Sequence, residues 1–128
     1  MTEPEWHDEN IAVAIHAAMI SKHGGSDGVR DRGLLSSALD RPRNRWAYEQ
    51  PTLAELAAAY AFGIARNHPF IDGNKRVAFM AAYTFLGLND HRLTATESDA
   101  AITFLALAAG ELEEVALADW IAAYLDEI

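Results

Sequence analysis

The stretch TLAELAAAYAFGIARNHPFIDGNKR, residues 52–76, contains one complete helix, a short connection and the start of a second helix. Thr52 and Glu55 have the spacing of a capping box, so a helix should begin at the next residue, Leu53. Pro69 disfavours the helical conformation at the residue before it, and this helix should therefore end near Asn67. A second helix should follow from about Gly73. We expect these two helices to be neighbours in the fold.

The rest of the chain also favours helices over strands. Apolar residues recur at helical spacing in four further segments, which are bounded by capping residues and glycines: residues 9–23, 34–39, 97–109 and 115–125. A shorter segment between Pro42 and Pro51 is predicted to be extended over Arg45–Glu49. The sequence thus predicts an all-α domain over residues 1–128, with about six helices and one short extended segment.

Composition restricts the classes of function. The 128 residues carry a formal net charge of −9, with 51% hydrophobic residues and no cysteine. Such a charge disfavours a broad surface for nucleic acid or for an acidic membrane. No disulfide or thiolate zinc site is possible without cysteine. Because the sequence shows neither a leader nor a long apolar segment, we expect a cytoplasmic protein.

One feature breaks a local rule, because the helix that starts near Gly73 begins with two cations, Lys75 and Arg76. The helix dipole disfavours positive charge at this end. A bound phosphate would remove the conflict, held by free backbone N–H groups and by the two cations. Asp72 could hold a divalent cation, and His68 could accept a proton from an attacking hydroxyl. These are the parts of a site for phosphoryl or nucleotidyl transfer.

Each residue also has an ordinary structural explanation. Asp72 or Asn74 could be the N-cap of the helix. Asn74 could equally brace the loop without meeting a substrate. His68 could be a plain loop histidine, and the two cations could simply be solvated. What favours a site is that all these residues fall within nine positions and have compatible roles.

The stretch HPFIDGNKR, residues 68–76, resembles the motif H-x-F-x-[DE]-[AG]-N-[GK]-R of the Fic/Doc family. The similarity extends over nearly the whole chain and is greatest toward the Doc, or death-on-curing, toxins. It implies the compact helical Fic fold and a toxin of a toxin–antitoxin pair. It further implies a transferase that uses ATP and Mg²⁺, with His68 as catalytic residue, Asp72 on the metal, and Gly73, Asn74, Lys75 and Arg76 on the phosphates.

The motif bears on which group is transferred. Fic enzymes that attach AMP usually carry G-N-G-R-x-x-R, whereas Lys75 and Phe79 occupy the places of the second glycine and the second arginine. Lys75 is typical of Doc. The resemblance to Doc implies a kinase that phosphorylates a threonine of elongation factor Tu and stops translation. Pro69 and Gly73 are closer to Fic, so AMP transfer to a protein hydroxyl is the alternative.

The resemblance implies two further elements. Arg66 matches a functional arginine of Doc, although a solvated charge at a helix C-terminus would explain it equally well. The segment Arg45, Trp46, Ala47, Tyr48 and Glu49 lies where the family has a flap that pairs with the target chain. In the alternative, Trp46 and Tyr48 simply pack on the core.

Control is expected to come from a separate chain. Many Fic proteins carry the inhibitory motif [ST]-x-x-x-E-[GN]. Glu9 and Asn10 match its last two positions, but Glu5 occupies the Ser/Thr position, and no other stretch fits. The resemblance suggests an antitoxin whose amphipathic helix enters an apolar groove. Ile11, Ile15 and Met19 are candidates for one wall of that groove. A non-catalytic binding module on the same fold is the alternative from another class of function.

Overall fold

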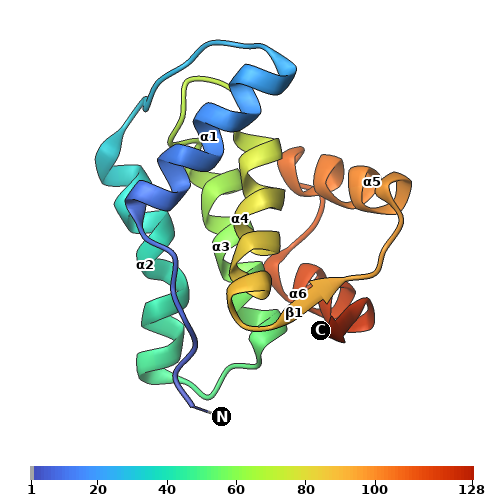
Figure 1. The fold of residues 1–128 in the computed structure, drawn as a ribbon. Coiled ribbons are helices and arrows are strands. Elements are labelled where there is room, and N and C mark those ends of the chain that lie inside the picture. Colours follow the sequence, from blue (N-terminus) through green and yellow to red (C-terminus); the bar gives the residue numbers. More distant parts are fainter. Residues whose placement is uncertain (1) are drawn as a thin grey trace.

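The computed structural model describes residues 2–128 and has six helices and one small two-stranded sheet (Figure 1). This confirms the all-α prediction, and among the described residues no helix has the length and hydropathy that a membrane span requires. The sheet is antiparallel, with Leu93 opposite Leu125. The elements are α1 (Glu9–His23), α2 (Arg32–Tyr48), α3 (Leu53–Asn67), α4 (Asn74–Leu88), β1 (His91–Leu93), α5 (Glu97–Ala108), α6 (Glu114–Ala123) and β2 (Leu125–Glu127).

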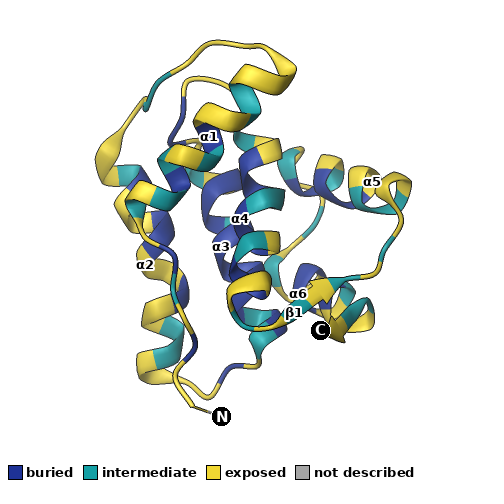
Figure 2. Ribbon diagram, viewed as in Figure 1, coloured by how far each residue is buried: buried dark blue, intermediate teal, exposed yellow. Residues whose placement is uncertain are grey.

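Helix α3 is the centre of the fold. It packs against α2, α4, α5 and α6, and most of its residues are buried (Figure 2). Many of these residues are alanines, which allow neighbouring helices to approach closely while preserving high helix propensity. The predicted capping box is present, since Thr52 Oγ1 accepts from the N–H of Glu55 and the Glu55 carboxylate accepts from the N–H of Thr52. The start of α3 is therefore set by its own sequence, and its length is enclosed by the neighbouring helices.

Helices α2 and α3 approach each other closely at Ala38 and Gly63. A methyl group added to Gly63 would lie 3.1 Å from both Cα and the carbonyl oxygen of Ala38. Pro42, inside α2, has no N–H to donate to that same carbonyl four residues earlier. The carbonyl of Ala38 faces Gly63 instead, so the absence of a side chain on Gly63 sets the distance between the two helices.

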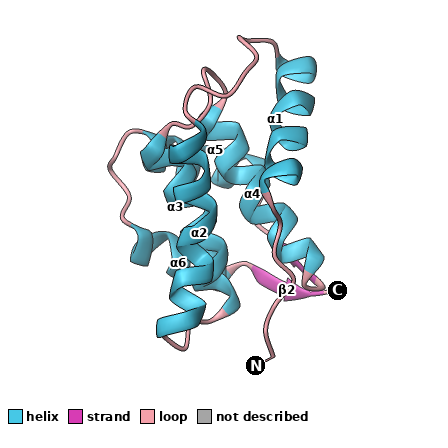
Figure 3. Cartoon of the chain, turned by 90° about the vertical axis from the view of Figure 1, so that its left-hand side faces the viewer, coloured by secondary structure: helices cyan, strands magenta, loops and turns pink. Residues whose placement is uncertain are grey.

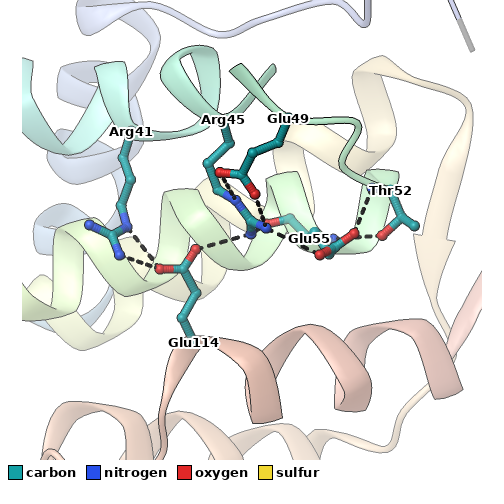
Figure 4. A network of polar contacts seen from close by, with 6 residues as sticks. All are labelled: Arg41, Arg45, Glu49, Thr52, Glu55 and Glu114. Carbon is teal, nitrogen blue, oxygen red and sulfur yellow. Dashed lines mark hydrogen bonds and ion pairs between the residues drawn. The ribbon is translucent and has the colours of Figure 1, made fainter. Parts of the chain in front are cut away.

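The segment Arg45–Glu49 is not extended, contrary to prediction. Helix α2 continues through Pro42 to Tyr48, and Glu49 is its C-cap. Prolines usually interrupt helices, but here the turn beyond Pro42 is held by Arg45, whose guanidinium contacts Glu49 at 3.1 Å and Glu55 at 3.1 Å (Figure 4). These contacts, together with the packing of α2 on α3, outweigh the tendency of Pro42 to end the helix.

The Arg45 contacts belong to a network of side chains that ties three helices together (Figure 4). Glu114 of α6 receives Arg45 at 3.3 Å and also binds Arg41 of α2. Burial lowers the pKa of Arg45, but its hydrogen bonds to Glu49 and Glu55 and the charges of Glu49 and Glu114 together outweigh that effect, so the pKa is raised. The pKa of Glu55 is lowered, chiefly by the N–H of Thr52. The network therefore stays charged and anchors α6 against α2 and α3.

The residues before α1 pack into the core rather than hanging free. His7 is fully buried, stacks on Tyr60 with ring centroids 4.2 Å apart, and donates from Nε2 to the carbonyl oxygen of Ala81 at 3.2 Å. In Figure 3 this stretch passes alongside α4. Within α1 the two buried residues are Ala12 and His16. The candidate groove wall of Ile11, Ile15 and Met19 is only half-buried.

Replacement of Gly63 tests the close approach of α2 and α3. Gly63→Ala should lower the free energy of unfolding by about 1–2 kcal/mol, because the backbone of α2 must move and the better helix propensity of alanine compensates only in part. Gly87 of α4 is the matched control, since its added methyl group meets nothing within 4 Å. Gly87→Ala should raise stability by about 0.5–1 kcal/mol. Urea unfolding gives both values, and a stabilised Gly63→Ala protein would contradict this account.

The buried imidazole of His7 should make stability depend on pH. Burial lowers its pKa from the ordinary value of 6.5. The unfolded chain therefore takes up the proton more readily than the folded protein. The contribution of His7 to the free energy of unfolding is full above about pH 6.5 and is lost as the pH falls toward the folded-state pKa. The loss should reach about 1.4 kcal/mol per pH unit.

His7→Gln keeps a donor for Ala81 and cannot titrate. Urea unfolding of both proteins between pH 5 and pH 8 should show a shallower acid-side slope for the variant. Equal slopes in the two proteins would mean that His7 is not the group responsible.

Candidate functional site

The loop between α3 and α4, residues 68–73, is held by a second loop, residues 24–31. The two loops meet at an isolated antiparallel bridge between Val29 and Phe70. The N–H of Ile71 donates to the carbonyl of Gly28 at 3.1 Å. The N–H groups of residues 30 and 31 both donate to the carbonyl of Pro69, at 2.7 and 3.1 Å. Backbone pairing thus fixes the loop that carries most of the candidate residues.

His16 of α1 also holds this loop in place, through contacts with Phe70 and Asp72. Its ring stacks on Phe70 with centroids 4.1 Å apart and an interplanar angle of 6°. Its Nε2 donates to the carbonyl of Asp72 at 2.9 Å, and its Nδ1 lies 3.6 Å from a carboxylate oxygen of Asp27. This role was not predicted from the sequence, because His16 lies beside the apolar stripe of α1. The available signal was its i, i+4 spacing from Ala12, the other buried residue of the helix.

Helix α4 begins without a side-chain cap, unlike most helices of the fold. Its N-cap is Gly73, with φ of 78°, and no side chain accepts from its first turn. Neither Asp72 nor Asn74 is the N-cap, which removes one ordinary explanation for these residues. Four other helices are capped by a side-chain oxygen, from Asp8, Asp31, Thr52 and Thr96.

The uncapped start leaves donors available to an anion. Within residues 2–128, the N–H groups of Asn74, Lys75 and Arg76 have no hydrogen-bond acceptor. The N–H of Gly73 is not among them, because it donates to Asp72 Oδ1 at 2.8 Å. Such a helix terminus combines unpaired donors with the positive end of the dipole and suits phosphate.

The side chain of Asn74 braces the loop. Its Oδ1 accepts from the N–H of Phe70 at 3.0 Å, and its Nδ2 donates to the carbonyl of the same residue at 2.9 Å. The amide group is therefore committed to the backbone of Phe70. Any contact of Asn74 with an anion would come from its main-chain N–H.

Asp72 is exposed and fits the carboxylate ligand of a nucleotide-bound metal. Its Oδ2 accepts from the N–H of Ser26 at 3.2 Å, and its Oδ1 from Gly73, so each oxygen retains free lone pairs. Among residues 2–128, no group of three or more His, Cys, Asp or Glu side chains could hold a metal by itself. Magnesium is usually held by one or two carboxylates together with phosphate oxygens, and Asp72 meets that need.

Three cations of the predicted site have no carboxylate partner within 4.0 Å in the described part of the chain: Arg66, Lys75 and Arg76. The side chains of Lys75 and Arg76 are exposed on the first turn of α4. The guanidinium of Arg66 lies 5.4 Å from the centroid of the Phe62 ring, a cation–π contact that orders it. These charges are free to bind an anion.

His68 terminates α3 and faces a pocket. It is the C-cap residue, with φ of 48° and ψ of 56°, a left-handed conformation that costs a non-glycine residue about 1–2 kcal/mol. The pocket has a volume of about 190 Å³. Arg66 and His68 line it together with apolar residues of α3, of the end of α5 and of the α5–α6 connection, among them Phe62, Leu107 and Leu112. Arg66 and His68 therefore lie on the wall of the same pocket.

The predicted flap is not part of this site. Arg45–Glu49 lie at the C-terminal end of α2, beside Glu55 at the start of α3. His68 follows the other end of α3, about 20 Å from Glu55 along the helix axis. Figure 1 shows the C-terminal end of α2 and the loop between α3 and α4 at opposite ends of the molecule. Loop 24–31 occupies the neighbouring position instead. The sequence did not predict this pairing, because the loop is rich in glycine and pairs with Phe70 through one isolated bridge rather than through a strand.

The chain is similar in sequence to known proteins over most of its length. A model described as the Fic/DOC family matches residues 6–86. The chain belongs to the Fic/Doc family. It is 37% identical over 108 residues to "Protein kinase doc" of Escherichia phage P1, covering 84% of this chain and 85% of that protein. It is also 47% identical over 76 residues to "Toxin Doc" of Mycolicibacterium smegmatis, covering 56% of this chain and 57% of that protein.

Family membership makes this chain a Fic/Doc-type transferase. In the Fic/Doc motif of this chain, His68 ends α3, Phe70 is anchored on His16, Asp72 completes the loop, and residues 73–76 cap and open α4. The motif is therefore a helix end, a pinned loop and a helix start.

Removal of the Asn74 side chain should release the loop. Asn74→Ala leaves the N–H of the buried residue Phe70 without an acceptor, which should cost about 1–3 kcal/mol in the free energy of unfolding. Asn44 is the matched control, because it lies exposed in α2. Asn44→Ala should leave stability within about 0.5 kcal/mol. Urea unfolding measures both, and equal effects at the two positions would refute the bracing role.

Proposed function

We propose that this chain is a Doc-like toxin that transfers phosphate from ATP to a Ser or Thr hydroxyl of a translation factor of the elongation factor Tu type. The observation that carries the proposal is the start of α4, where an uncapped helix end bears the exposed cations Lys75 and Arg76. Cations at that end are unfavourable unless an anion is bound there. Phosphate of ATP satisfies both the free N–H groups and the side-chain charges.

The residues divide the reaction between them. His68 accepts the proton of the attacking hydroxyl, whose oxygen forms a bond to the γ-phosphorus while the bond to the ADP oxygen breaks. The N–H groups at the start of α4, with Lys75 and Arg76, stabilise the charge on the phosphoryl oxygens. Arg66, which lines the pocket beside His68, supplies a further charge. Asp72 would hold Mg²⁺, which when bound neutralises charge on the phosphates.

Transfer of phosphate rather than AMP is supported at two positions. Lys75 stands where AMP-transferring relatives usually have glycine, and Phe79 where they have arginine. Phe79 is half-buried and packs edge-on against Phe104 of α5, with ring centroids 5.1 Å apart. This position therefore offers an aromatic contact and no charge for a diphosphate. The name of the phage relative, "Protein kinase doc", points to the same reaction.

We further infer that the toxin acts in the cytoplasm and is restrained by an antitoxin supplied in trans. Arg76 has no carboxylate partner among the described residues, so no glutamate of this chain covers it there. The names of the relatives, which refer to Doc and to a toxin, support a toxin–antitoxin pair. The proposed groove wall is less suitable than expected, because Ile15 and Met19 pack against the core.

Labelled ATP tests the reaction directly. The protein is incubated with elongation factor Tu and with ATP labelled at either the α- or the γ-phosphate. We expect label to reach elongation factor Tu from the γ position only. Label arriving from the α position would establish AMP transfer and overturn the kinase assignment.

Histidine variants link the reaction to the site. His68→Ala should lower transfer by at least about 10²-fold, because general base catalysis contributes that much, while the melting temperature changes little. His23 is exposed and serves as the matched control. His23→Ala should retain full transfer. A non-catalytic binding module would instead arrest growth equally well with His68→Ala at equal protein level.

A further inference from the structure

The backbone at His68 is held in an unfavourable conformation. With φ of 48°, it is one of two non-glycine residues with positive φ in the described chain, the other being Asp90. A residue in this region keeps it only when its surroundings determine it, and such residues cluster at functional sites. The direction of the His68 side chain follows from this backbone. Whatever fixes the helix end therefore also fixes the direction in which the His68 side chain leaves the backbone.

Arg30 makes the bonds that fix it. Its Nε donates to the carbonyl oxygen of His68 at 2.7 Å, and its Nη2 donates to the carbonyl oxygen of Asn67 at 2.9 Å. Its main-chain N–H donates to the carbonyl of Pro69 at 2.7 Å. One residue of loop 24–31 thus binds three successive carbonyls, and those of residues 67 and 68 belong to the end of α3, where intrahelical donors are lacking.

The charge of Arg30 serves this contact alone. Arg30 has no carboxylate within 4.0 Å among residues 2–128. A cation is favoured at the negative end of the helix dipole, and a planar guanidinium presents a rigid fork of donors to two carbonyls, which an ammonium group lacks. The other contacts at this turn come from Asn67 Nδ2 to the carbonyl of Leu34 at 3.0 Å and from the N–H of His68 to Ile64 at 3.1 Å. Neither binds the carbonyl of His68.

We propose that Arg30 is a positioning residue for His68, acting through its guanidinium fork on the last carbonyls of α3. The inference rests on the proposed role of His68 as the proton acceptor. Arg30 does not touch the reacting atoms in this account. Its removal should allow the turn at His68 to relax toward the ordinary right-handed region, which displaces the imidazole from the acceptor hydroxyl.

Three variants separate positioning from general stability. Arg30→Met removes both donors at similar side-chain length, and Arg30→Lys keeps the charge without the fork. Arg32→Met is the matched control, because Arg32 lies two residues away, is 69% exposed and pairs with Glu9 of α1. All three should fold, as judged by circular dichroism and by thermal melting.

Kinetics with elongation factor Tu and ATP provide the first readout. Arg30→Met should lower kcat about 10- to 100-fold, the size expected for a misplaced catalytic group, with KM for ATP within about twofold. Arg30→Lys should give an intermediate kcat, and Arg32→Met should match the wild type. In a His68→Ala background, Arg30→Met should have no further effect, since the two residues act on one step.

The HN–Hα coupling of residue 68, measured by NMR, provides a readout independent of activity, because it reports φ. The coupling should change in both Arg30 variants and not in Arg32→Met. Unchanged coupling and unchanged kcat in the Arg30 variants would overturn the proposal, and Arg30→Lys decides the matter if Arg30→Met does not fold. If His68→Ala retains turnover, the proposed function fails, while the coupling still shows whether Arg30 holds this turn.

Discussion

The enclosure of α3 by four other helices is the constraint on which the rest of the structure depends. A helix with almost no exposed face can be buried only if its neighbours come close, and the alanines of α3 permit this. At Gly63 even a methyl group would press on the backbone of α2. Once α3 is enclosed, both of its ends have defined positions in the molecule. The capping box sets one end, and the other end carries His68.

The candidate site is built at that second end by residues distant in sequence. Loop 24–31 pairs with loop 68–73 through main-chain hydrogen bonds, and His16 of α1 lies beneath Phe70. These contacts leave little freedom to the loop between α3 and α4. The unfavourable conformation of His68 is sustained by this framework rather than by its own sequence. The geometry of the candidate site is thus a consequence of packing between two loops and a helix.

Charge is distributed unevenly over this acidic protein. The chain has 10 Lys and Arg against 19 Asp and Glu. Arg41 and Arg45 are neutralised in the network with Glu114, far from the site. Lys75 and Arg76 have no such partners in the part of the chain that the structure describes, and they stand at a helix end that is itself positive. An anion is therefore attracted to one small region, while the surface as a whole repels polyanions.

The sequence by itself determined the elements whose signals are local. The capping box at Thr52, the stop before Pro69 and the start of α4 near Gly73 all depend on residues within a few positions of one another, and each was predicted correctly. The motif at residues 68–76 identified the family for the same reason, which the match to the Fic/DOC family confirms. The roles of its residues in catalysis stay a prediction.

Only the tertiary structure decided the features that depend on distant partners. The turns of α2 beyond Pro42 are helical because Glu55 and Glu114 hold Arg45, and no local pattern reports those contacts. The buried face of α1 includes His16 because Phe70 and Asp72, more than fifty residues later, receive its ring. Arg30 reaches α3 only after two loops have paired. Local capping and steric rules act within a few residues, whereas burial and long-range hydrogen bonds exist only once the chain has folded.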